Sequence, residues 1–159
     1  MSFTDVLFKP NGRITQGQFW GGWAVLVGAN IVASFIPLIG TVISLGLIYV
    51  GCCVYGKRLH DMGKSAWIHA IPWAVSLIIT IFAIVKMMPV IMQMAEDDPE
   101  LASDPAFVMA AVGPAMGVLL VSFLVWVGYT IWVGVAGPDP DTNQYGPPAG
   151  MVGAPDAFV

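Results

Sequence analysis

The stretch VYGKRLHDMGKSAWIH, residues 54–69, lies between two long apolar segments and decides how the whole fold is interpreted. It contains three of the six basic residues and both histidines: Lys57, Arg58, Lys64, His60 and His69. Polar residues gathered in one part of an apolar chain are typical of a site for catalysis, ligand or metal binding, or of a partner-binding patch. They are also typical of a connector that sets membrane topology and satisfies its own hydrogen bonds.

The composition is that of an integral membrane protein. Of the 159 residues, 57% are hydrophobic and only 10% are charged, whereas about a quarter of the residues in a typical soluble domain are charged. Six basic residues without a basic stripe exclude nucleic-acid binding. The adjacent Cys52 and Cys53 lie inside an apolar run, and we interpret them as small buried apolar residues.

Four segments are long enough for transmembrane helices, which need about 17 to 25 apolar residues. The predicted spans are residues 18–36, 38–55, 67–94 and 106–135. Only Pro37 and Gly40 interrupt the junction between the first two spans, which predicts a tight helical hairpin. Thr15 followed by Gln18 fits a capping box before the first span, and Ser65 fits an N-cap before the third. The predicted fold is therefore all-α and polytopic, with four transmembrane helices.

The distribution of charge predicts the orientation, because basic residues favour cytoplasmic loops. With four spans, five basic residues fall on one side: Lys9, Arg13, Lys57, Arg58 and Lys64. The opposite loop, AEDDPELASDP at residues 95–105, has five acidic residues and neither Lys nor Arg. We expect both termini in the cytoplasm.

Three parts follow from this topology. Residues 1–17 are predicted as a cytoplasmic N-terminal interfacial segment, residues 18–136 as the four-helix transmembrane domain, and residues 137–159 as a Gly/Pro-rich cytoplasmic tail. The tail is expected to be irregular, with order only around Asn143 to Pro147.

Three motifs resemble a known family of small bacterial inner-membrane proteins, the one catalogued as domain of unknown function 805. They are GRITQGQFW before the first span, KRLHDMGKSAW between the second and third, and NQYGPP after the last. Lys57 stands where a second arginine is common in the family, Ala66 where glycine is common, and Ile68 where a second tryptophan is common. The resemblance implies a four-helix protein of the bacterial inner membrane. It implies no established activity.

Arg58, His60 and Asp61 are the strongest candidates for a site. Arg58 and Asp61 are three residues apart near the end of a predicted helix, where they can form an ion pair, and His60 can titrate near neutral pH. The group could bind a headgroup, a phosphate or a proton, or it could satisfy loop carbonyls and the N-terminal segment. We define the candidate residues together as the polar collar: Arg13, Gln18, Arg58, His60, Asp61, Lys64, Ser65, Asn143 and Tyr145.

The sequence predicts no catalytic residue, no cofactor and no metal ligand set. A metal site needs three or four converging ligands, and a turn and a helix start separate His60 from His69. Ser65 is better suited to capping than to nucleophilic attack, and the chain lacks a Gly-rich phosphate loop.

The sequence therefore favours a non-enzymatic protein surrounded by membrane lipids. It works by associating with other protein chains, as an accessory or scaffold subunit of a larger membrane complex or as a homo-oligomer. One alternative is a small channel or transporter gated at the polar collar, although Lys86 is the only Lys, Arg, Asp or Glu inside the predicted spans. Another is an anionic-lipid-binding protein, because each basic residue near an anionic surface contributes about 1 kcal/mol.

Overall fold

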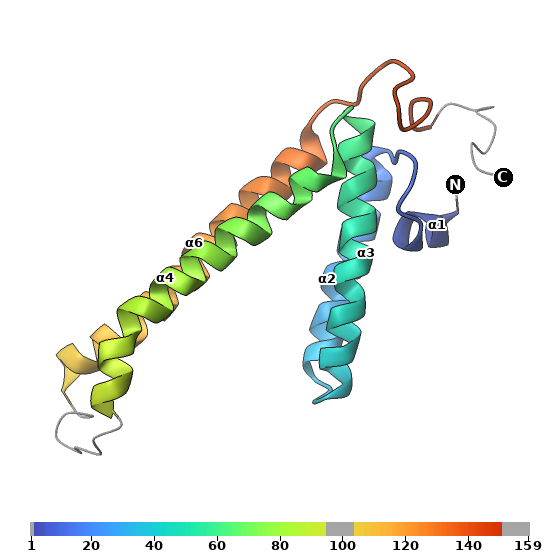
Figure 1. Ribbon diagram of the computed structural model, residues 1–159. Helices are drawn as coiled ribbons and strands as arrows, with labels where there is room; N and C mark the ends of the chain where they lie inside the picture. The colour runs from blue at the N-terminus through green and yellow to red at the C-terminus, as the bar shows by residue number, and fades with distance from the viewer. Residues whose placement is uncertain (1, 95–103, 151–159) are drawn as a thin grey trace. The chain divides into compact units, whose positions relative to one another are not determined.

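The computed structural model describes residues 2–94 and 104–150, and most of these residues are helical (Figure 1). The helices are α1 (Phe3–Phe8), α2 (Gln16–Ser34), α3 (Ile39–Asp61), the 3₁₀ turn η1 (Ala66–His69), α4 (Ala70–Met94) and α6 (Pro105–Val135). Within the described ranges there is no β strand, only an isolated bridge between Asn143 and Gly146. The predicted all-α class is confirmed. The described residues form two compact units, 2–69 with 131–150 and 70–94 with 104–130.

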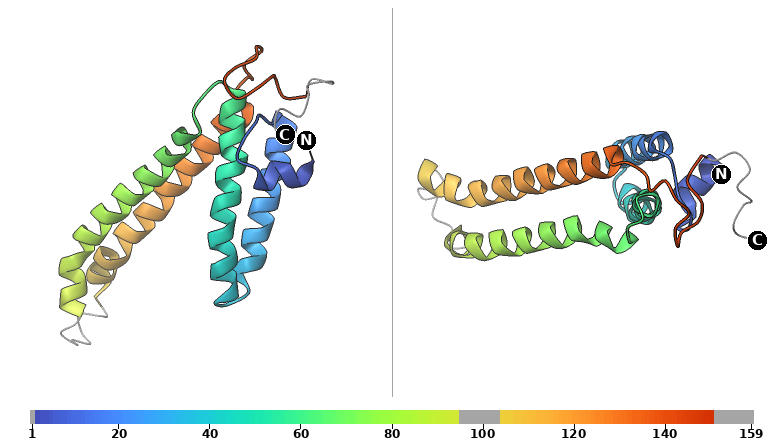
Figure 2. Two further views of the ribbon diagram at one scale, coloured as in Figure 1. Left: turned by 45° about the vertical axis from the view of Figure 1, so that its right-hand side comes forward. Right: turned by 90° about the horizontal axis from the view of Figure 1, so that it is seen from above.

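In the first unit, α2 and α3 form the predicted tight hairpin (Figures 1 and 2). The predicted capping box starts α2: the Thr15 hydroxyl accepts from the Gln18 backbone N–H at 3.2 Å, and the Gln18 side chain accepts from the Thr15 N–H at 2.9 Å. The helix ends at Ser34, before Pro37. Leu38, with φ 62°, then completes the turn into α3.

Glycines allow α2 and α3 to approach closely. A Cβ atom on Gly22 would lie 3.1 Å from Cγ2 of Val54. At the hairpin turn, a Cβ atom on Gly40 would collide with the backbone carbonyl of Ala33. Small residues at such crossings let two backbones pack at van der Waals distance, which is the main source of helix association in lipid.

The helix α3 continues six residues beyond Tyr55, the predicted end of the second span. The polar residues that we expected in a connector are therefore helical, up to Asp61. The helix ends in a Schellman motif, in which Gly63 N–H donates to the His60 carbonyl at 3.0 Å and Lys64 N–H to the Leu59 carbonyl at 2.8 Å. Gly63 adopts φ 69°, a left-handed conformation that favours glycine.

In the second unit, α4 and α6 run alongside each other (Figure 2). Trp73 of α4 packs edge-on against Trp126 of α6, with ring centroids 5.2 Å apart. The third predicted span begins as a 3₁₀ turn, where the Ser65 hydroxyl accepts from the Trp67 N–H at 3.3 Å. Ser65 thus occupies the predicted helix start. The predicted acidic loop lies outside the described residues except at its end, Asp104 and Pro105.

Three of the described helices are long and apolar enough to cross a membrane: Ile39–Asp61, Ala66–Val90 and Pro105–Val135. Their apolar side chains are largely exposed, as shown by Leu119 at 70% and Ile78 at 67%, which suits contact with lipid. The helix α2 is not among the three. It forms where the first span is predicted, but it contains Gln16, Gln18 and Asn30.

We predict that Gly40→Ala destabilises the first unit by about 1–3 kcal/mol, because the added methyl group would force the α2–α3 turn apart. Gly46→Ala is the matched control on the same helix, since a Cβ atom there meets no atom within 4 Å. It should leave stability unchanged or raise it by up to about 1 kcal/mol. Thermal unfolding in detergent, followed by tryptophan fluorescence, measures both. Equal melting temperatures for the two variants would contradict the close approach at Gly40.

Candidate functional site

The polar collar is centred on Arg13, in the loop between α1 and α2. The Arg13 side chain is 1% exposed, and its guanidinium donates five hydrogen bonds. The acceptors are Asp61 Oδ1 (3.0 Å), the Asp61 carbonyl (3.1 Å), the Asp139 carbonyl (2.5 Å), the Asp141 carbonyl (2.8 Å) and the Gly146 carbonyl (3.3 Å). An arginine side chain has five N–H donors, so this chain provides an acceptor for each donor of Arg13.

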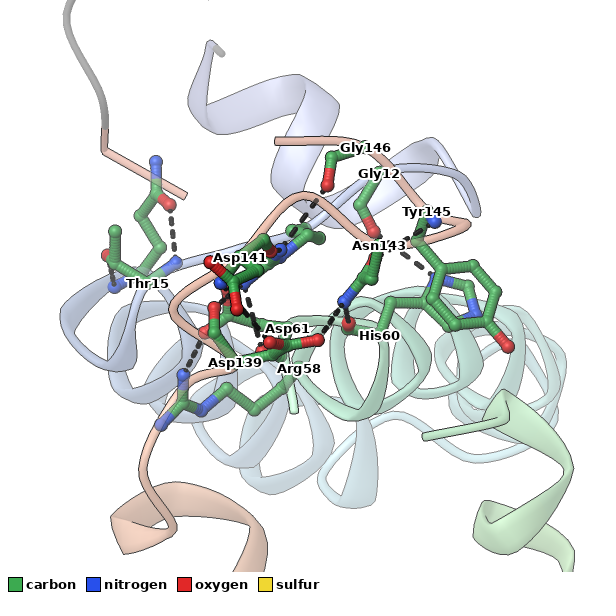
Figure 3. Close-up of polar contacts among 12 residues, drawn as sticks. Gly12, Thr15, Arg58, His60, Asp61, Asp139, Asp141, Asn143, Tyr145 and Gly146 are labelled. Carbon is green, nitrogen blue, oxygen red and sulfur yellow. Dashed lines mark hydrogen bonds and ion pairs between the residues drawn. The ribbon is translucent and has the colours of Figure 1, made fainter. Parts of the chain in front are cut away.

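Asp61 joins Arg13 to Arg58. Its second carboxylate oxygen accepts from Nη1 of Arg58 at 2.5 Å, and its side chain is 1% exposed. The ion pair predicted between Arg58 and Asp61 is thus confirmed. Arg58 also donates to the carbonyls of Val133 at 3.2 Å and Ala136 at 2.6 Å, where α6 ends. Figure 3 shows Arg58, Asp61 and Asp139 gathered at the end of α3.

Lys57, which the sequence analysis did not include in the polar collar, is fully buried. Its ammonium donates to the carbonyls of Asp5 at 2.5 Å and Val6 at 2.8 Å. Both carbonyls lie near the C-terminal end of α1, where helical carbonyls run short of intrahelical partners. The Asp5 carbonyl also accepts from the Lys9 N–H at 3.1 Å. Lys57 therefore caps α1. It can do so because the N-terminal segment folds back against α3.

His60 lies on another side of α3. Its Nδ1 is 3.2 Å from the Gly12 carbonyl, so this nitrogen carries the proton. The Tyr145 ring stacks on the His60 ring with centroids 3.7 Å apart and planes within 8° (Figure 3). The carboxylate of Asp61 is hydrogen-bonded to the two arginines, and His60 is held by the N-terminal loop and the tail.

The tail is held over a longer stretch than the expected Asn143 to Pro147, because the carbonyls of Asp139 and Asp141 also bind Arg13. Asp139 N–H donates to the Asp61 carbonyl at 2.7 Å. The Asn143 amide donates to the His60 carbonyl at 3.1 Å and to the Asp139 carboxylate at 3.0 Å. A Cβ atom on Gly63 would lie only 3.0 Å from Asp139 Oδ2, so the tail sits directly on the end of α3.

Six of the nine candidates of the polar collar take part in this cluster or in its immediate backbone contacts, and three lie apart from it. The Gln18 side chain serves the α2 cap, Lys64 is exposed, and Ser65 starts η1. The sequence analysis missed Lys57, Asp139 and Asp141. The spacing of Asp139 and Asn143 in GPDPDTN, a segment rich in turn-forming residues, is the one local signal that could have indicated an ordered strap.

The geometry favours binding between segments of this chain. The described residues contain no group of three or more His, Cys, Asp or Glu side chains arranged to hold a metal ion. With every Arg13 donor directed at an acceptor of the chain, an incoming phosphate would have to displace existing hydrogen bonds to reach that guanidinium. The arrangement fastens the N-terminal loop, the end of α3, the end of α6 and the tail to one another.

No family model, curated protein or solved structure matches this chain.

Asp61→Asn should lower the free energy of unfolding by about 3–5 kcal/mol, because removing one partner of a buried ion pair leaves the other charges uncompensated. Two guanidinium groups depend on this carboxylate. Thermal unfolding in detergent provides the measurement. Lys64→Gln is the matched control, since Lys64 is exposed three residues away, and it should change stability by less than about 0.5 kcal/mol. Equal losses in the two variants would contradict the central role of Asp61.

Asn143→Ala should raise the pKa of Asp139. In the folded chain, the hydrogen bond from the Asn143 side chain, followed by that from the Asp141 N–H, lowers the Asp139 pKa from 3.8. A carboxylate with a lowered folded pKa contributes its stabilisation fully above 3.8, and this is lost as the pH falls through the folded value. Without Asn143 the carboxyl should therefore titrate closer to 3.8.

Carbon-13 NMR of labelled aspartate in micelles measures this titration. Thr142→Ala changes an exposed residue of the same strap and should leave the Asp139 curve in place. Superimposable curves for wild type and Asn143→Ala would show that the Asn143 contact does not hold the carboxylate.

Proposed function

We propose that this chain is a non-enzymatic protein of the bacterial inner membrane that works by association, as an accessory or scaffold subunit of a larger membrane complex or as a homo-oligomer. It crosses the membrane four times, with both termini in the cytoplasm. The polar collar is a structural clasp that holds one conformation of the cytoplasmic end. The observation that carries this proposal is the saturation of Arg13 and the burial of Arg58 and Asp61 against acceptors of the same chain.

The clasp supports association better than recognition of anionic lipid. Three of the five basic residues predicted on the cytoplasmic side are buried with partners inside the chain: Arg13, Lys57 and Arg58. Only Lys9 and Lys64 are exposed to the surroundings, and Lys9 pairs with Asp5 at 3.0 Å. Little free positive charge is left to attract a headgroup.

The exposed helices supply the surface for association. The apolar side chains of α4 and α6 are extensively exposed in the described chain, so they contact lipid, another protein or a second copy. Helix contacts in lipid need small residues, and a Cβ atom at Gly113, Gly117 or Gly128 of α6 meets no atom within 4 Å. These glycines are open to an outside helix.

We also propose that the chain belongs to the domain of unknown function 805 family. The three motifs that carry the resemblance are the three segments that the clasp joins. Arg13 comes from GRITQGQFW, Arg58 and Asp61 from KRLHDMGKSAW, and Asn143 from NQYGPP. A shared clasp gives a physical reason for the three motifs to occur together.

The test is extraction of the tagged protein from its own membrane into polymer-bounded native nanodiscs, followed by mass spectrometry of the retained proteins and lipids. Wild type and Lys64→Gln should retain the same protein partner, or a second copy, at a fixed ratio. Asp61→Asn should lose that partner, because the cytoplasmic end no longer holds one conformation.

A wild-type chain that emerges as a monomer without a protein at fixed ratio would contradict association. A channel gated at the polar collar would replace the proposal on one result. The wild-type chain would carry solute across liposome membranes, and Lys64→Gln would abolish this flux without changing the melting temperature.

A further inference from the structure

The short helix α1 packs on both helices of the α2–α3 hairpin. Val6 is 1% exposed and lies close to Gly22, where an added Cβ would be 3.6 Å from its Cγ1. The Phe3 ring lies beside Gly21, with 3.6 Å between its Cε2 and a Cβ placed there. The helix is thus fixed against the part of the hairpin that follows the first turn of α2 (Figure 1).

Three carbonyls near the C-terminal end of α1 accept hydrogen bonds from side chains of α3. Lys57 binds the carbonyls of Asp5 and Val6, and the Tyr49 hydroxyl donates to the Phe8 carbonyl at 2.9 Å. Tyr49 precedes Lys57 by eight residues, or about 12 Å along the helix axis. Free helix ends at a protein surface can be left to water, whereas in a bilayer each backbone group needs a partner from the protein.

The exposed residues of α1 are two phenylalanines and Thr4, and the helix also carries one ion pair. Phe3 and Phe8 are 51% and 53% exposed. Asp5 and Lys9 pair at 3.0 Å, and this contact is the first cause that lowers the pKa of Asp5 to about 2. On α3, the residues before Tyr49 also expose apolar side chains, with Leu45 63% and Ile48 43% exposed.

We propose that α1 is a membrane-inserted anchor, whose Phe3 and Phe8 enter the boundary between headgroups and acyl chains of the cytoplasmic leaflet. The proposal rests on the proposed transmembrane orientation and adds a depth to the N-terminal segment. The occupant of this surface is phospholipid, because the exposed phenylalanines continue the apolar surface of a helix long enough to span the bilayer. The paired charges of Asp5 and Lys9 cancel, so zwitterionic lipid is sufficient.

Spin labels test this depth in the full-length chain. In a Cys52→Ala, Cys53→Ala background, single cysteines are introduced as Phe8→Cys, Phe3→Cys, Asn11→Cys and Leu45→Cys. Each labelled protein is placed alone in phosphatidylcholine nanodiscs, and collision with oxygen is compared with collision with a water-soluble nickel chelate. Asn11 is exposed in the loop that leads back to the collar, and Leu45 is exposed on α3.

The oxygen-to-nickel collision ratio should be at least about threefold higher at Phe8 and Phe3 than at Asn11, and highest at Leu45. A Phe8 ratio equal to that of Asn11, with Leu45 still protected from nickel, would overturn the anchor and leave the membrane topology standing. A nickel-accessible Leu45 would overturn the proposed topology, and the anchor with it. A Phe8 label shielded from both reagents would show that protein covers this face and would also overturn the lipid anchor.

Discussion

The first unit depends on one carboxylate, that of Asp61, held between two buried guanidinium groups. A buried charge is costly unless it is paired and hydrogen-bonded, and here Arg13 occupies one oxygen and Arg58 the other. The two arginines in turn direct their remaining donors to backbone carbonyls from the loop, the end of α6 and the tail. A single acidic side chain therefore holds the two arginines that join the N-terminal loop, the end of α6 and the tail to the end of α3.

The last turns of α3 act as a hub because successive residues of a helix point in different directions, about 100° apart. Lys57 faces α1, Arg58 faces the end of α6, His60 faces the N-terminal loop and Tyr145, and Asp61 faces Arg13. Every residue from Cys53 to Asp61 is buried, whereas Cys52, which the sequence analysis also expected to be buried, is exposed. A helix that is buried all round needs partners on all sides, and the irregular segments supply them with their carbonyls.

This arrangement explains how irregular backbone can lie at the edge of an apolar domain. Loops close to a bilayer require partners for their polar groups. In this chain the partners are long cationic side chains, each of which supplies several donors. Their charged groups lie beside Asp61 or at the end of a helix. The clasp and the proposed anchor are built in the same way. Lys57 and Tyr49 donate to backbone carbonyls of α1, as Arg13 donates to backbone carbonyls of the tail.

The sequence by itself determined the all-α class, the four long helical segments, the hairpin and the two helix starts at Thr15 and Ser65, but not the short helix α1. These features depend on apolar length, proline and glycine position and local capping, all of which are written within a few residues of each other. It also indicated the Arg58–Asp61 pair, since the two residues are three positions apart on a helix. Only the tertiary structure decided that α3 runs to Asp61, that Lys57 caps α1 and that Arg13 binds the carbonyls of the tail. Those contacts join residues 48 to 133 positions apart, and their acceptors are mostly backbone carbonyls, which every residue possesses and no sequence pattern marks.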